Sequence, residues 1–193
     1  MLKPRLILAS ASPRRQELLR QAGYTFDIRP ADIDESIFPP ALTPGGMVSY
    51  LAEQKARAVA SSLTNEIVLA ADTVVVLAGR IFGKPADRDD ARQMLSRLSG
   101  TVHSVLTAVA IVRPGTHFSR SQLVESSVQM RPLSSKEIEA YLDTNNWQGK
   151  AGSYGIQDPD PFVTRITGSL TNIVGLPMEE VRELLAAAGV SYI

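Results

Sequence analysis

Two charged residues lie at positions where a folded chain normally places apolar side chains. The first is Asp72, which interrupts the segment IVLAADTVVVL (67–77), where only Asp72 and Thr73 are polar. Because an ionised carboxylate that is buried without partners is costly, Asp72 requires a cation, hydrogen-bond donors or a shifted pKa. This favours a functional carboxylate on a strand. The alternative is that the chain bends at Ala71 and that Asp72 only caps a turn.

Lys55 is the second such residue. An apolar stripe at helical spacing is formed by Val48, Leu51, Ala52 and Val59. Lys55 falls on the same stripe, so its side chain is expected to point toward the core or into a cleft. The alternative is a lysine whose aliphatic stem packs while its ammonium reaches water.

The segment SASPRRQELL (10–19) begins a helix and places two arginines in its first turn. Ser12 is at the N-cap position and Pro13 is the first helical residue. The positive end of the helix dipole disfavours Arg14 and Arg15 there by roughly a few tenths of a kcal/mol each. The arrangement therefore predicts a negatively charged ligand at the helix start, where free backbone amides also attract anions.

Acidic residues gather in the proline-bounded loop ADIDESIFPP (31–40), which contains Asp32, Asp34 and Glu35. Acidic loop residues are often simply solvated. Carboxylate oxygens are, however, the ligands that Mg²⁺ takes up beside phosphates, and Glu35 is the residue that we expect at such a site.

A short basic motif, GRIFGK (79–84), resembles a phosphate-binding loop. It is one residue shorter than the P-loop spacing, and Pro85 follows it where Ser or Thr is required, so a P-loop is excluded. Lys84 can still reach a phosphate as a point charge.

These residues together predict one site. Four cations in phosphate-compatible positions would surround a polyphosphate: Arg14, Arg15, Lys55 and Lys84. Two carboxylates, Asp72 and Glu35, would hold a divalent cation or a water beside it. An enzyme acting on a nucleotide or a similar ligand is the favoured interpretation.

The composition argues against several other functions. The chain has 193 residues, 44% of them hydrophobic, with 20 basic and 20 acidic residues and no cysteine. The balanced charge argues against nucleic acid or an anionic membrane as a partner, and no apolar run is long enough to span a bilayer, so a cytoplasmic protein is expected. Cysteine catalysis and thiolate zinc sites are excluded. His103 and His117 are too isolated for a zinc site, and no GxSxG motif supports a serine nucleophile.

Hydrophobic periodicity and turn signals predict one α/β domain covering residues 1–193. Strands are expected at 6–9, 26–28, 67–77, 81–82, 102–112, 122–131, 162–166 and 172–174. Helices are expected at 13–22, 47–62, 87–98, 134–142 and 177–188. The strands on either side of Pro114 and Gly115 are expected to form a long hairpin, which makes the sheet mixed and not purely parallel.

Seven short motifs resemble, in the same order, the signatures of the Maf family of nucleoside triphosphate pyrophosphatases: LASASPRRQELL, DES, EQKA, AADTV, GKP, AGSYGIQ and NIVGLP. The resemblance runs from Leu6 to Leu185. It implies a two-lobed fold with a mixed sheet and a central cleft, related to that of inosine triphosphatases. It also implies homodimers, a divalent cation such as Mg²⁺ or Mn²⁺, and cleavage of a nucleoside triphosphate to the monophosphate and pyrophosphate.

The resemblance also implies which base is accepted. One branch of the family acts on dTTP and UTP, another acts on 7-methyl-GTP, and three positions separate the two. Here these positions are Arg14, Thr73 and Gln157, which match the pyrimidine branch, whereas the other branch carries Trp, Gln and Glu. Modified pyrimidine nucleotides are further candidate substrates. Asp72 is expected to orient or deprotonate the attacking water, directly or through the metal.

A nucleotide-sensing or interaction module is the opposing hypothesis, because members of the family also resemble septum-formation inhibitors. Hydrolysis of dTTP by the purified protein discriminates between the two. Tight binding without turnover would favour the sensor.

Overall fold

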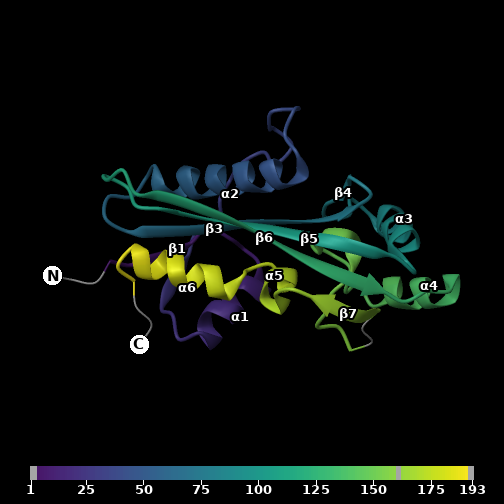
Figure 1. The fold of residues 1–193 in the computed structure, drawn as a ribbon. Helices are drawn as coiled ribbons and strands as arrows, with labels where there is room; N and C mark the ends of the chain where they lie inside the picture. The colour runs from purple at the N-terminus through teal and green to yellow at the C-terminus, as the bar shows by residue number, and fades with distance from the viewer. Residues whose placement is uncertain (1–3, 160–161, 191–193) are drawn as a thin grey trace.

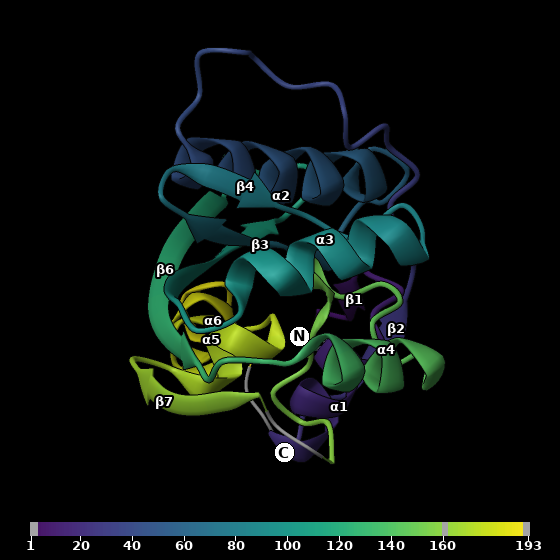
Figure 2. The same ribbon diagram turned by 90° about the vertical axis from the view of Figure 1, so that its right-hand side faces the viewer.

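One twisted sheet runs through the molecule. The computed structural model describes residues 4–159 and 162–190. In these residues the sheet has seven strands (Figures 1 and 2): β1 (Leu6–Leu8), β2 (Phe26–Ile28), β3 (Ile67–Leu77), β4 (Arg80–Phe82), β5 (Val102–Val112), β6 (Ser119–Met130) and β7 (Val163–Thr167). The helices around it are α1 (Pro13–Gln21), α2 (Pro44–Ala60), α3 (Arg88–Leu98), α4 (Ser135–Asp143), the short 3-10 helix η1 (Ala151–Ser153), α5 (Leu170–Val174) and α6 (Met178–Ala187).

The strand order β2-β1-β3-β5-β6-β7 leaves one edge of β3 only partly covered. Strand β5 pairs antiparallel with nearly the whole of the other edge. On the partly covered edge, β1 pairs in parallel with residues 67–69 and β4 pairs antiparallel with residues 75–77. In the described part of the chain no strand pairs with residues 70–74 on this edge, and we call this stretch the β3 gap. Asp72 lies at its centre.

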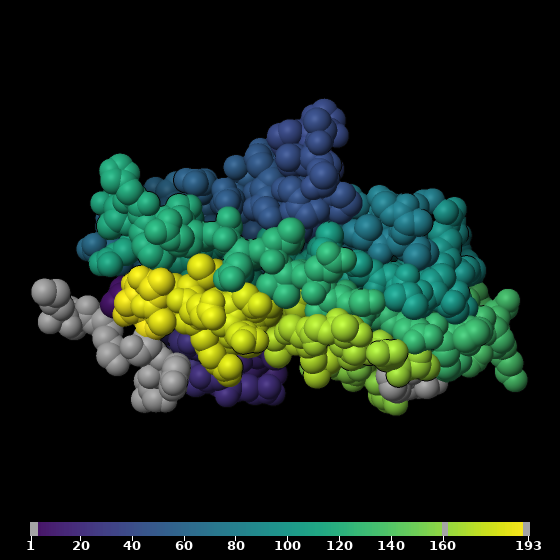
Figure 3. Space-filling view, viewed as in Figure 1, coloured from purple at the N-terminus to yellow at the C-terminus, as the bar shows by residue number. Residues whose placement is uncertain are grey.

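The helices cover different parts of the sheet. Helix α2 packs on one face, α1 and α6 pack on the opposite face, and α3 and α4 lie at one end (Figure 1). The side chains of β3 alternate between two cores: Val68, Ala70 and Val74 pack with α2, while Ile67, Leu69 and Ala71 pack with α1 and α6. The third core lies between the end of the sheet and α3 and α4. The segment that leads into α2 projects from the body of the molecule (Figure 3).

The structure confirms the mixed α/β sheet and the long hairpin predicted from the sequence; two elements start three residues before the predicted position, and the other paired boundaries differ by two residues or fewer. Helix α2 begins at Pro44 and not at residue 47, because Thr43 caps it by accepting a hydrogen bond from the amide of Gly46. Strand β6 begins at Ser119, three residues before the predicted start.

The strand predicted at 172–174 is wrong, because these residues belong to helix α5. The hydroxyl of the N-cap residue Ser169 accepts a hydrogen bond from the amide of Asn172, and the C-cap residue Gly175 has a φ of 112°. A cap at each end stabilises this short helix in spite of its β-branched residues.

His103, on β5, is part of the third core. Its side chain is 3% exposed, and its Nε2 lies 2.7 Å from the hydroxyl of Tyr154. The two rings meet edge to face. Burial lowers the pKa of His103 to about 4, so the imidazole is neutral at pH 7.

Because of His103, the protein should lose stability between pH 7 and pH 5. The ordinary histidine pKa of about 6.5 applies to the unfolded chain and exceeds the folded value, so the unfolded state takes up the proton first as the pH falls toward 4. These two pKa values predict a loss of about 2 kcal/mol in the free energy of unfolding, measurable by urea denaturation.

The variant His103→Gln should lack this part of the pH dependence. The matched control is His117→Gln, which replaces an exposed histidine and should keep it. An identical pH dependence in all three proteins would contradict the prediction.

Candidate active site

A cavity of about 940 Å³ lies against the β3 gap. All eight site residues expected from the sequence line it: Arg14, Arg15, Glu35, Lys55, Asp72, Thr73, Lys84 and Gln157. They come from segments far apart in the chain, and the fold brings every one of them to the same place.

Asp72 and Lys55 form a buried ion pair on the α2 side of the sheet. Lys55 Nζ lies 2.6 Å from Asp72 Oδ1, and both residues are only 6% exposed. The carboxylate therefore has the cation that its burial requires. Strand β3 continues through Ala71, so the interpretation of Asp72 as a turn cap is wrong. The interpretation of Lys55 as a lysine with its ammonium in water is also wrong.

The same ammonium pairs with a second carboxylate. Lys55 Nζ lies 3.0 Å from Glu35 Oε1, and Lys84 Nζ lies 3.8 Å from Glu35 Oε2. Although burial raises the pKa of Glu35, the charge of Lys55, helped by Lys84 and Arg15, lowers it below its ordinary value. One lysine thus bridges the two carboxylates that the sequence assigned to a metal.

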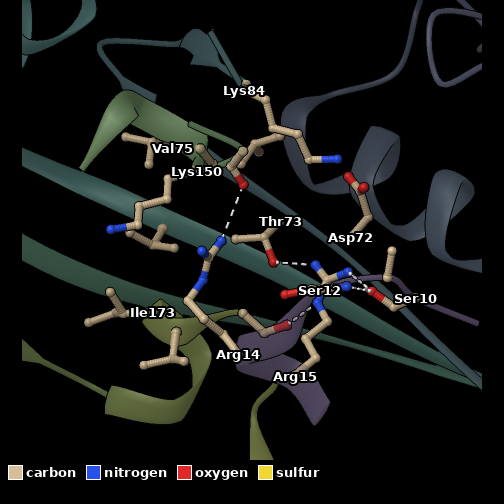
Figure 4. A pocket seen from close by; sticks show the side chains of 18 of the residues that line it. Ser10, Ser12, Arg14, Arg15, Asp72, Thr73, Val75, Lys84, Lys150 and Ile173 are labelled. Atoms are coloured by element: carbon tan, nitrogen blue, oxygen red, sulfur yellow. Dashed lines mark hydrogen bonds between the residues drawn. The ribbon is translucent and has the colours of Figure 1, made fainter. Parts of the chain in front are cut away.

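The guanidinium of Arg15 fills the edge of the sheet at the β3 gap (Figure 4). Its Nη1 donates to the carbonyl of Ala71 (2.9 Å) and to the hydroxyl of Ser10 (3.1 Å). Nε donates to the carbonyl of Gly175 (2.8 Å) and Nη2 donates to the hydroxyl of Thr73 (3.1 Å). Four of its five N–H groups are used in this way. Arg15 therefore supplies hydrogen-bond donors to the strand edge at the β3 gap, and its contact with a substrate stays a prediction.

Thr73 is the first member of a chain of hydroxyl groups that runs into the core. Thr107 donates to the carbonyl of Asn172 (3.0 Å), so its only hydroxyl hydrogen is occupied. The hydroxyl of Thr73, 2.9 Å from that of Thr107, must therefore donate to it while accepting from Arg15. Only an acceptor lone pair of Thr73 is left for a ligand.

The segment between α4 and β7 forms another part of the cavity wall. Nη2 of Arg14 donates to the carbonyl of Gly149 (3.2 Å), a contact visible in Figure 4. Gln157 is exposed, and its side-chain amide makes no hydrogen bond with the residues that the structure describes. Its donor and acceptor groups are therefore both available to a ligand.

The cavity is locally positive although the chain has no net charge. Its lining contains five cationic side chains and three acidic ones: Arg14, Arg15, Lys55, Lys84 and Lys150 against Glu35, Asp72 and Asp158. Lys84 is the most exposed member of the cluster around Glu35 and extends toward the Asp72 side of the cavity (Figure 4). This excess of positive charge suits a polyphosphate.

Three lining residues that form hydrogen bonds or ion pairs at the site were not predicted as site residues: Ser10, Lys150 and Asp158. Lys150 and Asp158 flank the glycine-rich run AGSYGIQ, and that run was the available signal for a structured loop at the site. Their pairing could not be read from the sequence, because it depends on the path of the loop.

The chain matches a family model described as Maf-like protein over residues 5–188. A dTTP/UTP pyrophosphatase of Anaeromyxobacter dehalogenans is 47% identical over 97% of this chain and 96% of its own length. Another of that name, from Cereibacter sphaeroides, is 50% identical over 96% of this chain and 95% of its own length.

The similar solved structures are more distant in sequence. The Ham1 protein of Staphylococcus aureus is 13% identical, with a TM-score of 0.48 over 65% of this chain and 71% of that one. A dITP/XTP pyrophosphatase of Mycobacterium abscessus is 16% identical, with a TM-score of 0.45 over 96% of this chain and 95% of that one.

Replacement of Arg15 by alanine should destabilise the fold. The change leaves the buried carbonyl of Ala71 without its donor, so we expect the free energy of unfolding to fall by about 3 kcal/mol, measured by denaturant titration. The control is Arg14→Ala, which removes one exposed hydrogen bond and should cost less than about 1 kcal/mol. If both variants lost the same small amount, Arg15 would not support the sheet edge.

Proposed function

The chain belongs to the Maf-like family, and from this premise we propose that it hydrolyses dTTP and UTP to the nucleoside monophosphate and pyrophosphate. Relatives named dTTP/UTP pyrophosphatase are 43–50% identical over nearly its whole length. The observation that carries the proposal is the cavity, where a cluster of cations adjoins two carboxylates that pair with the same lysine.

The triphosphate would bind to those cationic groups of the cavity that still have N–H donors available. Lys84 is more than half exposed, and Lys55 has three ammonium hydrogens of which the two carboxylates engage two. The amides at the start of α1 add further donors. Arg15 contributes its charge from behind, since its hydrogen bonds go mostly to the protein.

Hydrolysis requires a water placed beside the α-phosphorus. The water oxygen attacks this phosphorus, the bond to the oxygen between the α- and β-phosphates breaks, and pyrophosphate leaves with the electron pair. Asp72 has one oxygen bound to Lys55, while its Oδ2 accepts no hydrogen bond from the described residues. Asp72 Oδ2 is therefore the group that can take the proton of the water and pass it to solvent.

The residues present fit a divalent cation, Mg²⁺ or Mn²⁺, bound together with the nucleotide. The carboxylates of Asp72 and Glu35 already converge on one positive centre, the ammonium of Lys55. Within residues 4–159 and 162–190 no third acidic or histidine side chain joins them in a metal cluster, so phosphate oxygens and water would complete the coordination. When bound, the cation would neutralise charge on the phosphate oxygens.

Three residues of the cavity wall, Arg14, Thr73 and Gln157, would recognise the base. Thymine and uracil offer two carbonyl acceptors and one N3–H donor. Gln157 can donate and accept toward such an edge, Thr73 has an acceptor lone pair, and Arg14 can donate to a carbonyl or a phosphate. Modified pyrimidine nucleotides with the same edge are further candidate substrates.

Other expectations stay predictions: a homodimer, a cytoplasmic location, no nucleic-acid or membrane partner, and a single domain of two lobes covering 1–193. In the described ranges, each helix is too short or too polar to cross a bilayer.

The purified protein should hydrolyse dTTP and UTP, with ATP, GTP and 7-methyl-GTP as poor substrates, when pyrophosphate release is measured across this panel with Mg²⁺ or Mn²⁺.

The variant Asp72→Asn keeps the shape of the side chain and removes the proton acceptor. Its kcat should fall by roughly 10²–10⁴ while it remains folded. Tight nucleotide binding by the wild type without turnover would support a sensor, and normal kcat in folded Asp72→Asn would exclude Asp72 as the base.

Lys55→Met should create a metal dependence of stability. Without the ammonium, Asp72 loses its cation and Glu35 keeps only the exposed Lys84, and breaking a buried pair costs about 3–5 kcal/mol. The melting temperature should therefore fall, and Mn²⁺ added without nucleotide should raise it again by binding the two carboxylates.

The wild type should respond little to Mn²⁺ alone, because Lys55 already neutralises this pair. Lys84→Met serves as the matched control, since it removes an exposed lysine from the same cluster and should leave the melting temperature nearly unchanged. An equal effect of Mn²⁺ on all three proteins would contradict a shared cation position for Lys55 and the metal.

A further inference from the structure

A largely buried cluster of polar groups lies beside Gln157, the residue that we expect to recognise the base. Asp158 and Lys150 form an ion pair in which their side chains are only 11% and 13% exposed. The other oxygen of Asp158 accepts hydrogen bonds from the hydroxyl of Tyr141 (2.6 Å) and from the amide of Gly155 (3.0 Å). The carboxylate is therefore held by three groups: the hydroxyl of Tyr141 on α4, and Lys150 and the amide of Gly155 in its own loop.

The hydrogen bonds of Asp158 close a tight turn around Gln157. The amide of Asp158 donates to the carbonyl of Gly155 (3.2 Å), so residues 155–158 form a β-turn with Ile156 and Gln157 at its two central positions. The side chain of Asp158 returns to the amide of Gly155, the first residue of the same turn. The conformation of the backbone at Gln157 thus depends on the carboxylate next to it.

Gly155 leaves the space that this arrangement requires. A Cβ atom added at Gly155 would lie 2.5 Å from Lys150 Nζ and 2.7 Å from both carboxylate oxygens of Asp158. Any other residue would push the ion pair apart. The pair and the turn therefore fit together only with glycine at this position.

Tyr141 is a dependable donor to this carboxylate. Burial, followed by the hydrogen bond to Asp158, raises the pKa of Tyr141 above its ordinary value, so the hydroxyl stays protonated. Its ring packs edge to face on Phe162 in the third core. The position of Asp158 is thus tied to the third core through Tyr141.

We propose that Asp158 is a positioning residue for base recognition: bound by Lys150 and Tyr141, it fixes the turn that presents the Gln157 amide to the cavity. The inference rests on the proposed function, since it needs a pyrimidine nucleotide in the cavity. A fixed amide can favour thymine over cytosine, whose donor and acceptor groups at positions 3 and 4 are reversed. A Gln157 amide that is not held in place can rotate, which exchanges its donor and acceptor groups, so that it can bind the edge of either thymine or cytosine.

The test compares dTTP with dCTP as substrates of the wild type and of Asp158→Asn. The variant keeps the size of the side chain but leaves Lys150 without its counter-charge. We expect the ratio of kcat/KM for dTTP to that for dCTP to fall on the order of tenfold, through a higher KM for dTTP and with kcat nearly unchanged. The control is Asp143→Asn, which removes an exposed carboxylate of α4 that pairs with Arg88, and should keep the wild-type ratio.

A purely structural role would lower the activity toward both nucleotides equally, so an unchanged ratio in Asp158→Asn would overturn the inference. A wild type that accepts dCTP as well as dTTP would also overturn it. If Asp158→Asn fails to fold, Tyr141→Phe carries the test, because it removes one hydrogen bond and keeps the charge pair, and its ratio should fall about threefold. A wild type without any turnover would refute the proposed function itself.

Discussion

The arrangement of this site depends on one constraint, the β3 gap, whose five residues pair with no strand on one edge among the residues that the structure describes. Strand β1 separates from β3 after Leu69, and β4 joins only at Val75. The backbone between them needs other donors, because buried carbonyls without hydrogen bonds are costly. Arg15 supplies such a donor to Ala71 and at the same time brings the start of α1 to the gap. The β3 gap also lets side chains from both faces of the sheet reach one cavity. The adjacent residues Asp72 and Thr73 can therefore both line it while making different contacts.

The α2 face of the gap concentrates opposite charges. Asp72 lies inside a strand whose one other polar residue is Thr73, and α2 provides Lys55 from within its own buried stripe. A buried pair of this kind is a weak source of stability, since desolvation offsets much of the attraction. We infer that its role is functional, because the ammonium holds Asp72 and Glu35 near each other in the free protein. A cation that arrives with a triphosphate would find two carboxylates already facing the same point.

Much of this site could be predicted from the sequence, because charge in an apolar pattern is a strong signal. Asp72 and Lys55 stood out in this way, and the structure places both in the cavity. The pattern could not show that Lys55 pairs with the carboxylates, since the contact joins a helix to a strand across the core. The helix at 170–174 was missed because its apolar, β-branched residues resemble a strand, while caps at Ser169 and Gly175 decide its form. The hydrogen bonds of Arg15 follow from the strand order, which the sequence alone did not determine.

The most direct test of the account is to follow the oxygen of the attacking water. The protein would be incubated with dTTP in water enriched in ¹⁸O, and the ¹⁸O content of the separated products would be measured by mass spectrometry. Attack at the α-phosphorus, beside Asp72, predicts one ¹⁸O atom in the thymidine monophosphate and none in the pyrophosphate. Label in the pyrophosphate would place the attack at the β-phosphorus, and release of labelled orthophosphate would place it at the γ-phosphorus. Either result would contradict a pyrophosphatase of the kind proposed.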